Sequence, residues 1–330
     1  MKISRRKAFA LLGTLLLLVV FFKWRAVVKL FFSPPEKTKA KAAEPANPFM
    51  EEGKALVAVV RGKNVDAMVR EAVSLIGGLE KIGIKGKSVL VKPNVVSAAP
   101  HPVTTNPQVV RAVVKLLYEE GAGNVYVGDM SAMLALPTRK NMERNGIKQA
   151  AEEAGAEVIF FEDHGWVNVE LPKGRYIKRV SVTEWLYKVD RIINLPVIKT
   201  HRSASYSICL KNFVGATHIK QRPYLIDPTH WEELIAEMNL AWHPHLNIID
   251  GTKTLIENGP WEGPAADTGL VIATGDRVAG DVTGLGIIRQ FGRWAMVTEK
   301  DVWEQKQVKR AVELGLGVGK GAVKVVEKKI

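Results

Sequence analysis

Three lysines and one histidine carry the chemistry that this sequence suggests most directly. Lys92 and Lys199 follow short apolar runs and Lys211 lies between two such runs, and their ammonium groups could fix an anionic ligand such as a carboxylate or a phosphate. His201 lies two residues after Lys199, and we interpret these two residues as the candidate catalytic pair, with His201 as general acid and base or as a metal ligand. Further polar contacts with the same ligand are expected from Asn94, Thr200 and Asn212.

A second set of side chains has the donor atoms of a divalent-metal site. Imidazole nitrogen and carboxylate oxygen are common ligands of such ions. The candidate ligands, besides His201, are Asp129, His218, Asp250 and Asp281. Their spacing is less specific than that of a helical His-Glu-x-x-His motif, and the sequence contains no nucleophile elbow, P-loop or dinucleotide-binding glycine fingerprint. Anion binding and metal binding, separately or together, therefore both stay open.

The elements that must position these residues are short apolar runs, each of which ends in polar residues. The five polar ends are Lys92-Pro93-Asn94, Gly128-Asp129, Lys199-Thr200-His201, Asp250-Gly251 and Gly275-Asp276. Ligands of open α/β sheets bind beyond the carboxyl ends of the strands, so we expect the five ends to line one edge. Each end also has a plain structural explanation: Asp250-Gly251 is a common turn pair, and Asp276 would cap a helix.

Alternation of strand and helix patterns from residue 55 onward predicts a single α/β domain over 55–330, with a mostly parallel sheet covered by helices on both faces. Helical patterns cover residues 65–76, 107–120, 140–154, 231–241, 278–291 and 302–314. Alternating runs at 167–171 and 176–182 flank a Pro-Lys-Gly turn and predict a small β-hairpin insertion.

Residues 8–22 form an uncharged apolar run that follows four basic residues. At about 1.5 Å per residue the run is about 22 Å long, shorter than the ~30 Å hydrocarbon core, which suits a signal peptide. It would still span the bilayer if Lys7 and Lys23 extend toward the headgroups. The nearest small-residue pattern, at 40–42, lies far beyond the run, so we predict that residues 1–32 are retained as a membrane anchor and that 33–54 form a Pro/Lys/Ala linker.

The membrane side depends on two opposing signals. Ser4-Arg5-Arg6-Lys7-Ala8-Phe9 resembles a twin-arginine export signal, although Phe9 lies one position late, and this favours an extracytoplasmic domain. The six basic residues in the nineteen after the apolar run favour a cytoplasmic domain instead. We predict the exported side and keep the cytoplasmic face as the alternative.

The net charge of +13 belongs mainly to the N-terminal segment. Residues 1–42 contribute +9 and the remaining chain only +4, which excludes an extended phosphate-binding surface and with it a nucleic-acid partner. The single cysteine, Cys209, excludes an internal disulfide and an iron–sulfur cluster or cysteine-ligated zinc within this chain.

The order of these motifs resembles the family called domain of unknown function 362. The resemblance covers about residues 55–320 and rests on Lys92-Pro93-Asn94, 104–114, 127–129, Lys199-Thr200-His201, 210–215, Asp250-Gly251, 257–260, 263–264, Asp276 and Asp281. The family is mostly uncharacterised, and many members carry a ferredoxin-type cysteine segment or a twin-arginine signal. This chain has the signal-like segment without the cysteines, so a redox role would require a partner protein or another cofactor.

Two functions compete at this point. The first is an enzyme or cofactor-dependent protein that binds an anionic small molecule at the sheet edge. The second is a membrane-tethered, non-catalytic accessory protein that serves an iron–sulfur or redox assembly. Loss of activity on substitution of His201 would distinguish the first from the second.

Overall fold

The computed structural model describes residues 37–39 and 46–330. The predicted anchor, residues 1–32, and much of the predicted linker lie outside the described residues. Within the described part of the chain, no helix combines the length and the apolar character that crossing a bilayer requires. Folded structure begins before residue 55, because β2 (Met50–Glu51) pairs with β3 (Lys54–Arg61) and the side chain of Phe49 is fully buried.

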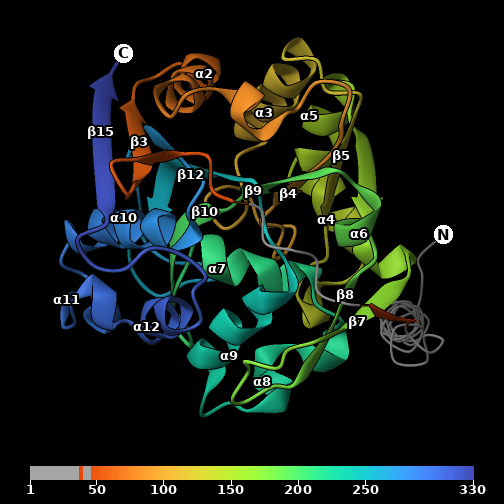
Figure 1. Cartoon of the computed structure of the whole chain (residues 1–330), viewed down its shortest axis with the longest axis vertical. Coiled ribbons are helices and arrows are strands. Elements are labelled where there is room, and N and C mark those ends of the chain that lie inside the picture. The colour runs from red at the N-terminus through yellow and green to blue at the C-terminus, as the bar shows by residue number, and fades with distance from the viewer. Residues whose placement is uncertain (1–36, 40–45) are drawn as a thin grey trace, which may run out of the picture.

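A large sheet forms the centre of the molecule (Figure 1). Its main path runs in the spatial order β15 (Val323–Lys329), β3, β14 (Leu270–Thr274), β12 (Leu246–Leu255), β9 (Arg191–Leu195), β4 (Ser88–Pro93), β5 (Asn124–Asp129) and β6 (Glu157–Phe160). Most neighbours are parallel, which confirms the predicted α/β class. The exception is β14, which is antiparallel to both β3 and β12.

Helices cover both faces of this sheet, as the sequence predicts. One face packs against α2 (Val65–Leu75), α3 (Pro107–Glu119), α4 (Thr138–Arg144) and α5 (Ile147–Glu153). The other packs against α7 (Cys209–Asn212), α9 (Trp231–Met238), α10 (Arg277–Arg289) and α12 (Lys306–Glu313). Alternate strand residues divide between the two cores: Leu56 and Ala58 face one, and Val57 and Val59 the other. This is the period-2 pattern of a strand that is buried on both sides.

Local signals explain where the helices begin and end. Asn106 caps α3 by accepting a hydrogen bond from Gln108 N, and Pro107 occupies the first turn. The predicted helix over 140–154 is two helices, because Gly146 adopts a φ of 82° between α4 and α5. The predicted helix over 302–314 is likewise shorter, and α12 begins only at Lys306.

The predicted hairpin is present as β7 (Trp166–Glu170) and β8 (Arg179–Thr183), and β1 (Lys37–Lys39) adds to β7 in parallel. Two short strands complete the region of interest: β10 (Val197–His201) and β11 (Ser205–Ser207) pair with each other, and β10 also pairs with β12. β13 (Ala265–Ala266) pairs with β12. The remaining helices are α6 (Trp185–Lys188), α8 (Pro223–Ile226) and α11 (Ala295–Thr298).

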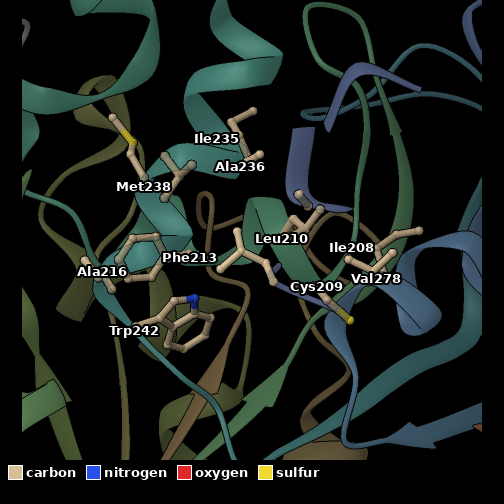
Figure 2. Packing of buried hydrophobic residues seen from close by; sticks show 14 of the residues in the cluster. Ile208, Cys209, Leu210, Phe213, Ala216, Ile235, Ala236, Met238, Trp242 and Val278 are labelled. Carbon is tan, nitrogen blue, oxygen red and sulfur yellow. The ribbon is translucent and has the colours of Figure 1, made fainter. Parts of the chain in front are cut away.

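The short helix α7 is held firmly although it has only one turn. Figure 2 shows Leu210 and Cys209 among residues of α9 and α10, with Phe213 beside Trp242. The rings of Phe213 and Trp242 stack with centroids 4.9 Å apart. Because its apolar residues are packed in this core, α7 carries its polar residues, Lys211 and Asn212, at a defined place near the sheet edge.

Candidate functional site

An ion pair joins the ends of β4 and β5. Lys92 Nζ lies 2.7 Å from Asp129 Oδ1, and both side chains are buried. The second carboxylate oxygen, Oδ2, accepts a 2.7 Å hydrogen bond from Val95 N, which fixes the rotation of the carboxylate. Gly215 lies against the pair, because a Cβ there would be 2.0 Å from Asp129 Oδ1 and 2.7 Å from Lys92 Nζ. A larger residue at position 215 would therefore displace the Asp129 carboxylate or the Lys92 amine.

A network of asparagine side chains connects this pair to Lys199. Lys199 Nζ donates to Asn94 Oδ1 and to the carbonyl oxygen of Val103, both at 2.6 Å. Asn94 Nδ2 donates to Asn212 Oδ1 at 3.2 Å, and Asn212 Nδ2 donates to Asn194 Oδ1 at 2.8 Å and to the carbonyl oxygen of Lys92 at 3.0 Å. These amides, of which Asn194 and Asn212 are buried, satisfy one another, which fixes the relative positions of β4, β9, β10 and α7.

Two further basic side chains lie at the same place without an acidic partner among the described residues. Among the described residues, neither Lys211 nor Arg222 forms an ion pair or a hydrogen bond with a carboxylate. The guanidinium of Arg222 is held by the backbone carbonyls of Val214, Met130 and Ser131, and its Nε has no hydrogen-bond partner in the described structure.

The protonation of the lysines follows from burial. Burial, with the nearby charges of Arg222 and Lys92, lowers the pKa of Lys211 to about 7. Burial lowers the pKa of Lys199 well below its usual range, and the charge of Lys211 lowers it further. Burial also lowers the pKa of Lys92, although the carboxylate of Asp129 opposes that effect.

His201 is neutral and has a defined tautomer. Its Nδ1 accepts hydrogen bonds from the backbone N–H groups of Ser203 and Ala204, both at 3.1 Å, so the proton of the neutral ring is on Nε2. Burial, and then the positive charges of Lys211 and Lys199, lower the pKa of His201 well below its usual range. The ring therefore presents a hydrogen-bond donor in place of a cation.

A cavity of about 180 Å³ lies in front of these groups. Asn94, Asp129, His201, Lys211 and Arg222 line it, whereas Lys92 and Lys199 are absent from its lining and contact the lining residues Asp129 and Asn94 from outside the cavity. The apolar part of its wall includes Val95, Met130, Val214, Trp231 and Trp261. Its volume equals that of about six water molecules at liquid density, so it suits a small ligand.

The structure brings together most of the predicted anion-binding residues. Lys92, Asn94, Lys199 and Asn212 form one hydrogen-bonded cluster, and Lys211 and His201 line the same cavity as Asn94. Thr200 is the exception. It alternates with its two neighbours along β10, and its Oγ1 lies 3.3 Å from the Cβ position of Gly259.

The four predicted metal ligands lie in separate environments. Asp129 pairs with Lys92, Asp250 accepts from Asn106 N and Thr252, and Asp281 accepts from Tyr206 Oη and Cys209 N. His218 packs edge-on against Trp166 and accepts from Lys220 N. No group of three or more His, Cys, Asp and Glu side chains over residues 37–39 and 46–330 has the arrangement of a metal site. The structure therefore does not assemble the metal site that these four residues were expected to form.

One of the five strand ends lies at the opposite edge of the sheet. Because β14 is antiparallel to β12, its carboxyl end and Asp276 face away from the lysine cluster. A larger cavity, about 920 Å³, lies there and is lined by Arg191, His245, Asp276 and others. Asp276 caps α10 and accepts from Ala279 N and Val318 N, so the structural explanation of this residue is confirmed.

Sequence patterns did not single out Arg222, Asn194 or Gly215 as site residues. Asn194 had a detectable signal, since it is a polar residue within the apolar run of β9. Gly215 ends the 210–215 motif, but its contact with the ion pair depends on the fold. Arg222 lies between η5 (Ile219–Gln221) and α8, where no strand end directs attention to it.

Comparisons with known proteins agree with the resemblance seen in the motifs. The family model described as Domain of unknown function (DUF362) matches residues 89–286. A relative from Synechocystis sp., described as Thylakoid-associated protein sll1697, is 27% identical over 228 residues, which are 65% of this chain and 67% of the relative.

Two solved structures resemble parts of the fold. The lactate racemase apoprotein from Thermoanaerobacterium thermosaccharolyticum has a TM-score of 0.35 and 13% identity, over 67% of this chain and 55% of that one. A structural-genomics protein from Thermotoga maritima has a TM-score of 0.36 and 15% identity, over 75% of this chain and 59% of that one. The chain thus spans less than two thirds of the length of each.

Proposed function

This chain belongs to the family described as Domain of unknown function (DUF362), and we propose that it binds a small anionic molecule, a carboxylate or a phosphate, in the cavity at the carboxyl edge of its sheet. One observation carries the proposal. Lys211 and Arg222 line the same cavity without an acidic partner among the described residues, while the carboxylate of the lining residue Asp129 is already paired with Lys92.

A ligand with negative charge would complete this arrangement. Arg222 is a buried cation without a counter-charge, which is costly, so an anion that contacts Arg222 and the protonated form of Lys211 gains from desolvated charge pairing. The Nε2–H of His201 would add a neutral donor to the same ligand. A divalent ion is not part of this proposal, because the predicted ligands do not converge.

Isothermal titration calorimetry with inorganic phosphate and with small mono- and dicarboxylates tests the proposal. Replacing Lys211 by Met should weaken binding by about tenfold or more, because one desolvated charge contact is lost. Lys115→Met is the control, since Lys115 is exposed on α3 at the other face of the sheet. Failure of every small anion to bind would remove the proposal and leave the accessory protein for a redox assembly as the remaining candidate, to be sought as a stable complex by native mass spectrometry.

We also propose that the protein works at a membrane surface, anchored by residues 1–32 with the folded domain on the exported side. The supports are the uncharged run over 8–22 and the relative that is described as thylakoid-associated. Cell fractionation should recover the full chain with membranes and a variant lacking residues 1–32 in the soluble fraction. Protease accessibility in intact and opened cells reports the side, and recovery of the full chain in the soluble fraction would contradict the anchor.

A further inference from the structure

Lys211 differs from the other two lysines of the cluster in what holds its amine. Lys92 Nζ is paired with Asp129, and Lys199 Nζ donates two hydrogen bonds of 2.6 Å. Lys211 Nζ has no hydrogen bond or ion pair with any residue that the structure describes, and its side chain is only partly buried and lines the cavity. Its amine is thus positioned for contact with a ligand and makes no hydrogen bond or ion pair that stabilises the described part of the fold.

The surroundings of Lys211 favour an uncharged amine. Arg222 and Lys92 are close enough to lower its pKa further than burial alone does, to about 7, so a large part of the side chain is neutral at physiological pH. An exposed lysine is neutral to only about 0.1% at that pH. A neutral amine in a partly apolar cavity, next to other cations, has the character of lysines that attack carbonyl carbon.

The other groups on the cavity match the needs of a carbonyl substrate that carries an acid group. Arg222, with its unpartnered Nε, supplies positive charge for a carboxylate. His201 supplies an Nε2–H donor for a carbonyl oxygen. Asp129, which is paired with Lys92 and lines the cavity, supplies a carboxylate that can accept a proton from the attacking nitrogen.

We propose that Lys211 forms an imine with the carbonyl carbon of a small oxo acid bound in this cavity. The nitrogen lone pair adds to the carbonyl carbon, the C=O π pair moves to oxygen, and that oxygen takes up a proton while the nitrogen releases one. The nitrogen lone pair of the carbinolamine then forms the C=N bond, and the hydroxyl group leaves with one proton as water. The nitrogen gives up its remaining proton, so the protons balance. Amine and carbonyl give imine and water, so the step needs no oxidant or reductant.

This inference rests on the proposed anion site, and three probes of similar size separate the two. Pyruvate has both a carboxylate and a ketone, propionate has only the carboxylate, and acetone has only the ketone. Each is incubated with the full chain, and sodium borohydride reduces any imine to a stable secondary amine. Peptide mapping by mass spectrometry then identifies the modified lysine, while calorimetry without borohydride measures binding.

Pyruvate should label Lys211 at least about tenfold more than the exposed Lys115 in the same digest, given their different fractions of neutral amine. Lys92 and Lys199 should stay unlabelled, and propionate should bind and protect Lys211 from pyruvate. Binding of pyruvate and propionate without labelling of Lys211 would overturn the imine and leave the anion site standing. Labelling of Lys211 by acetone as readily as by pyruvate, with no binding of propionate, would support the amine chemistry and overturn the anion site.

Discussion

Lys92 Nζ and Asp129 Oδ1 lie 2.7 Å apart in a buried ion pair that closes the ends of two adjacent parallel strands. The pair neutralises the lining carboxylate Asp129, and Lys211 and Arg222, with the exposed Arg202, are then lining basic residues without a carboxylate partner among the described residues. A buried pair of this kind depends on both members, because either one alone would be an uncompensated charge in a dry environment.

Replacing Asp129 by Asn should therefore destabilise the protein by about 3–5 kcal/mol, the usual cost of leaving one member of a buried pair alone. Urea denaturation measures the change. Glu152→Gln is the matched control, since it breaks the exposed pair with Lys148 and should change stability by no more than about 0.5 kcal/mol. Equal effects of the two substitutions would show that the buried pair is not a significant source of stability.

Replacing Gly215 by Ala should disrupt the same pair by steric contact. The new Cβ would lie 2.0 Å from Asp129 Oδ1, so the carboxylate must move, at an expected cost of about 1–3 kcal/mol. Gly286→Ala is the control, because a Cβ at that position in α10 meets no atom within 4 Å and should stabilise the helix by about 0.5–1 kcal/mol. Thermal denaturation compares the two variants with the parent. If Gly215→Ala leaves the stability unchanged, Gly215 does not lie against Asp129 as the structure shows.

Lys211 should make stability depend on pH in the alkaline range. Its pKa is about 7 in the folded protein against 10.5 for the free side chain, so between these values the unfolded chain binds more protons and stability rises with pH. Lys211→Met removes this dependence. The variant should be more stable than the parent at pH 6, and its advantage should shrink by about 1 kcal/mol or more at pH 9. Urea titrations that give the same difference at both pH values would show that Lys211 titrates normally.

Asp281 should make the stability of the protein fall as the pH rises through the acid range. Burial raises its pKa to about 7 from 3.8, so the folded protein binds more protons than the unfolded chain between these values, and stability falls as pH rises through them. Asp281→Asn keeps acceptors for Cys209 N and Leu210 N but does not ionise. Relative to the parent, the variant should gain stability on going from pH 4 to pH 8. Parallel stability curves would contradict the raised pKa.

Several elements of the fold follow from local sequence alone. Asn106-Pro107 starts a helix because the asparagine side chain caps it and proline suits its first turn. Alternating apolar residues over 167–171 and 176–182, on either side of a Pro-Lys-Gly turn, predict the hairpin that β7 and β8 form. The break at Gly146 was missed, because the apolar pattern continues across it and only its positive φ interrupts the helix.

The direction of β14 could have been inferred and was not. A parallel connection needs a crossover, usually a helix, and the sequence between β12 and β14 has no helical pattern. With β14 antiparallel, Asp276 moves to the opposite edge of the sheet and leaves the predicted site. Asp250 lies near the expected edge, but its carboxylate accepts hydrogen bonds from Asn106 N and from the N–H and hydroxyl groups of Thr252.

The sequence by itself determined the α/β class, the family and the concentration of positive charge in the first 42 residues, and it selected Lys92, Lys199, Lys211 and His201 as candidate site residues. These depend on composition, periodicity and short motifs. Only the tertiary structure decided that Lys92 and Lys199 are held by Asp129 and Asn94, that Lys211 and Arg222 line the cavity, and that the predicted metal ligands are dispersed. The reason is physical: partners more than a hundred residues apart in the chain, such as Lys92 and Asn212, meet only when strands pack side by side, and local patterns do not encode that distance.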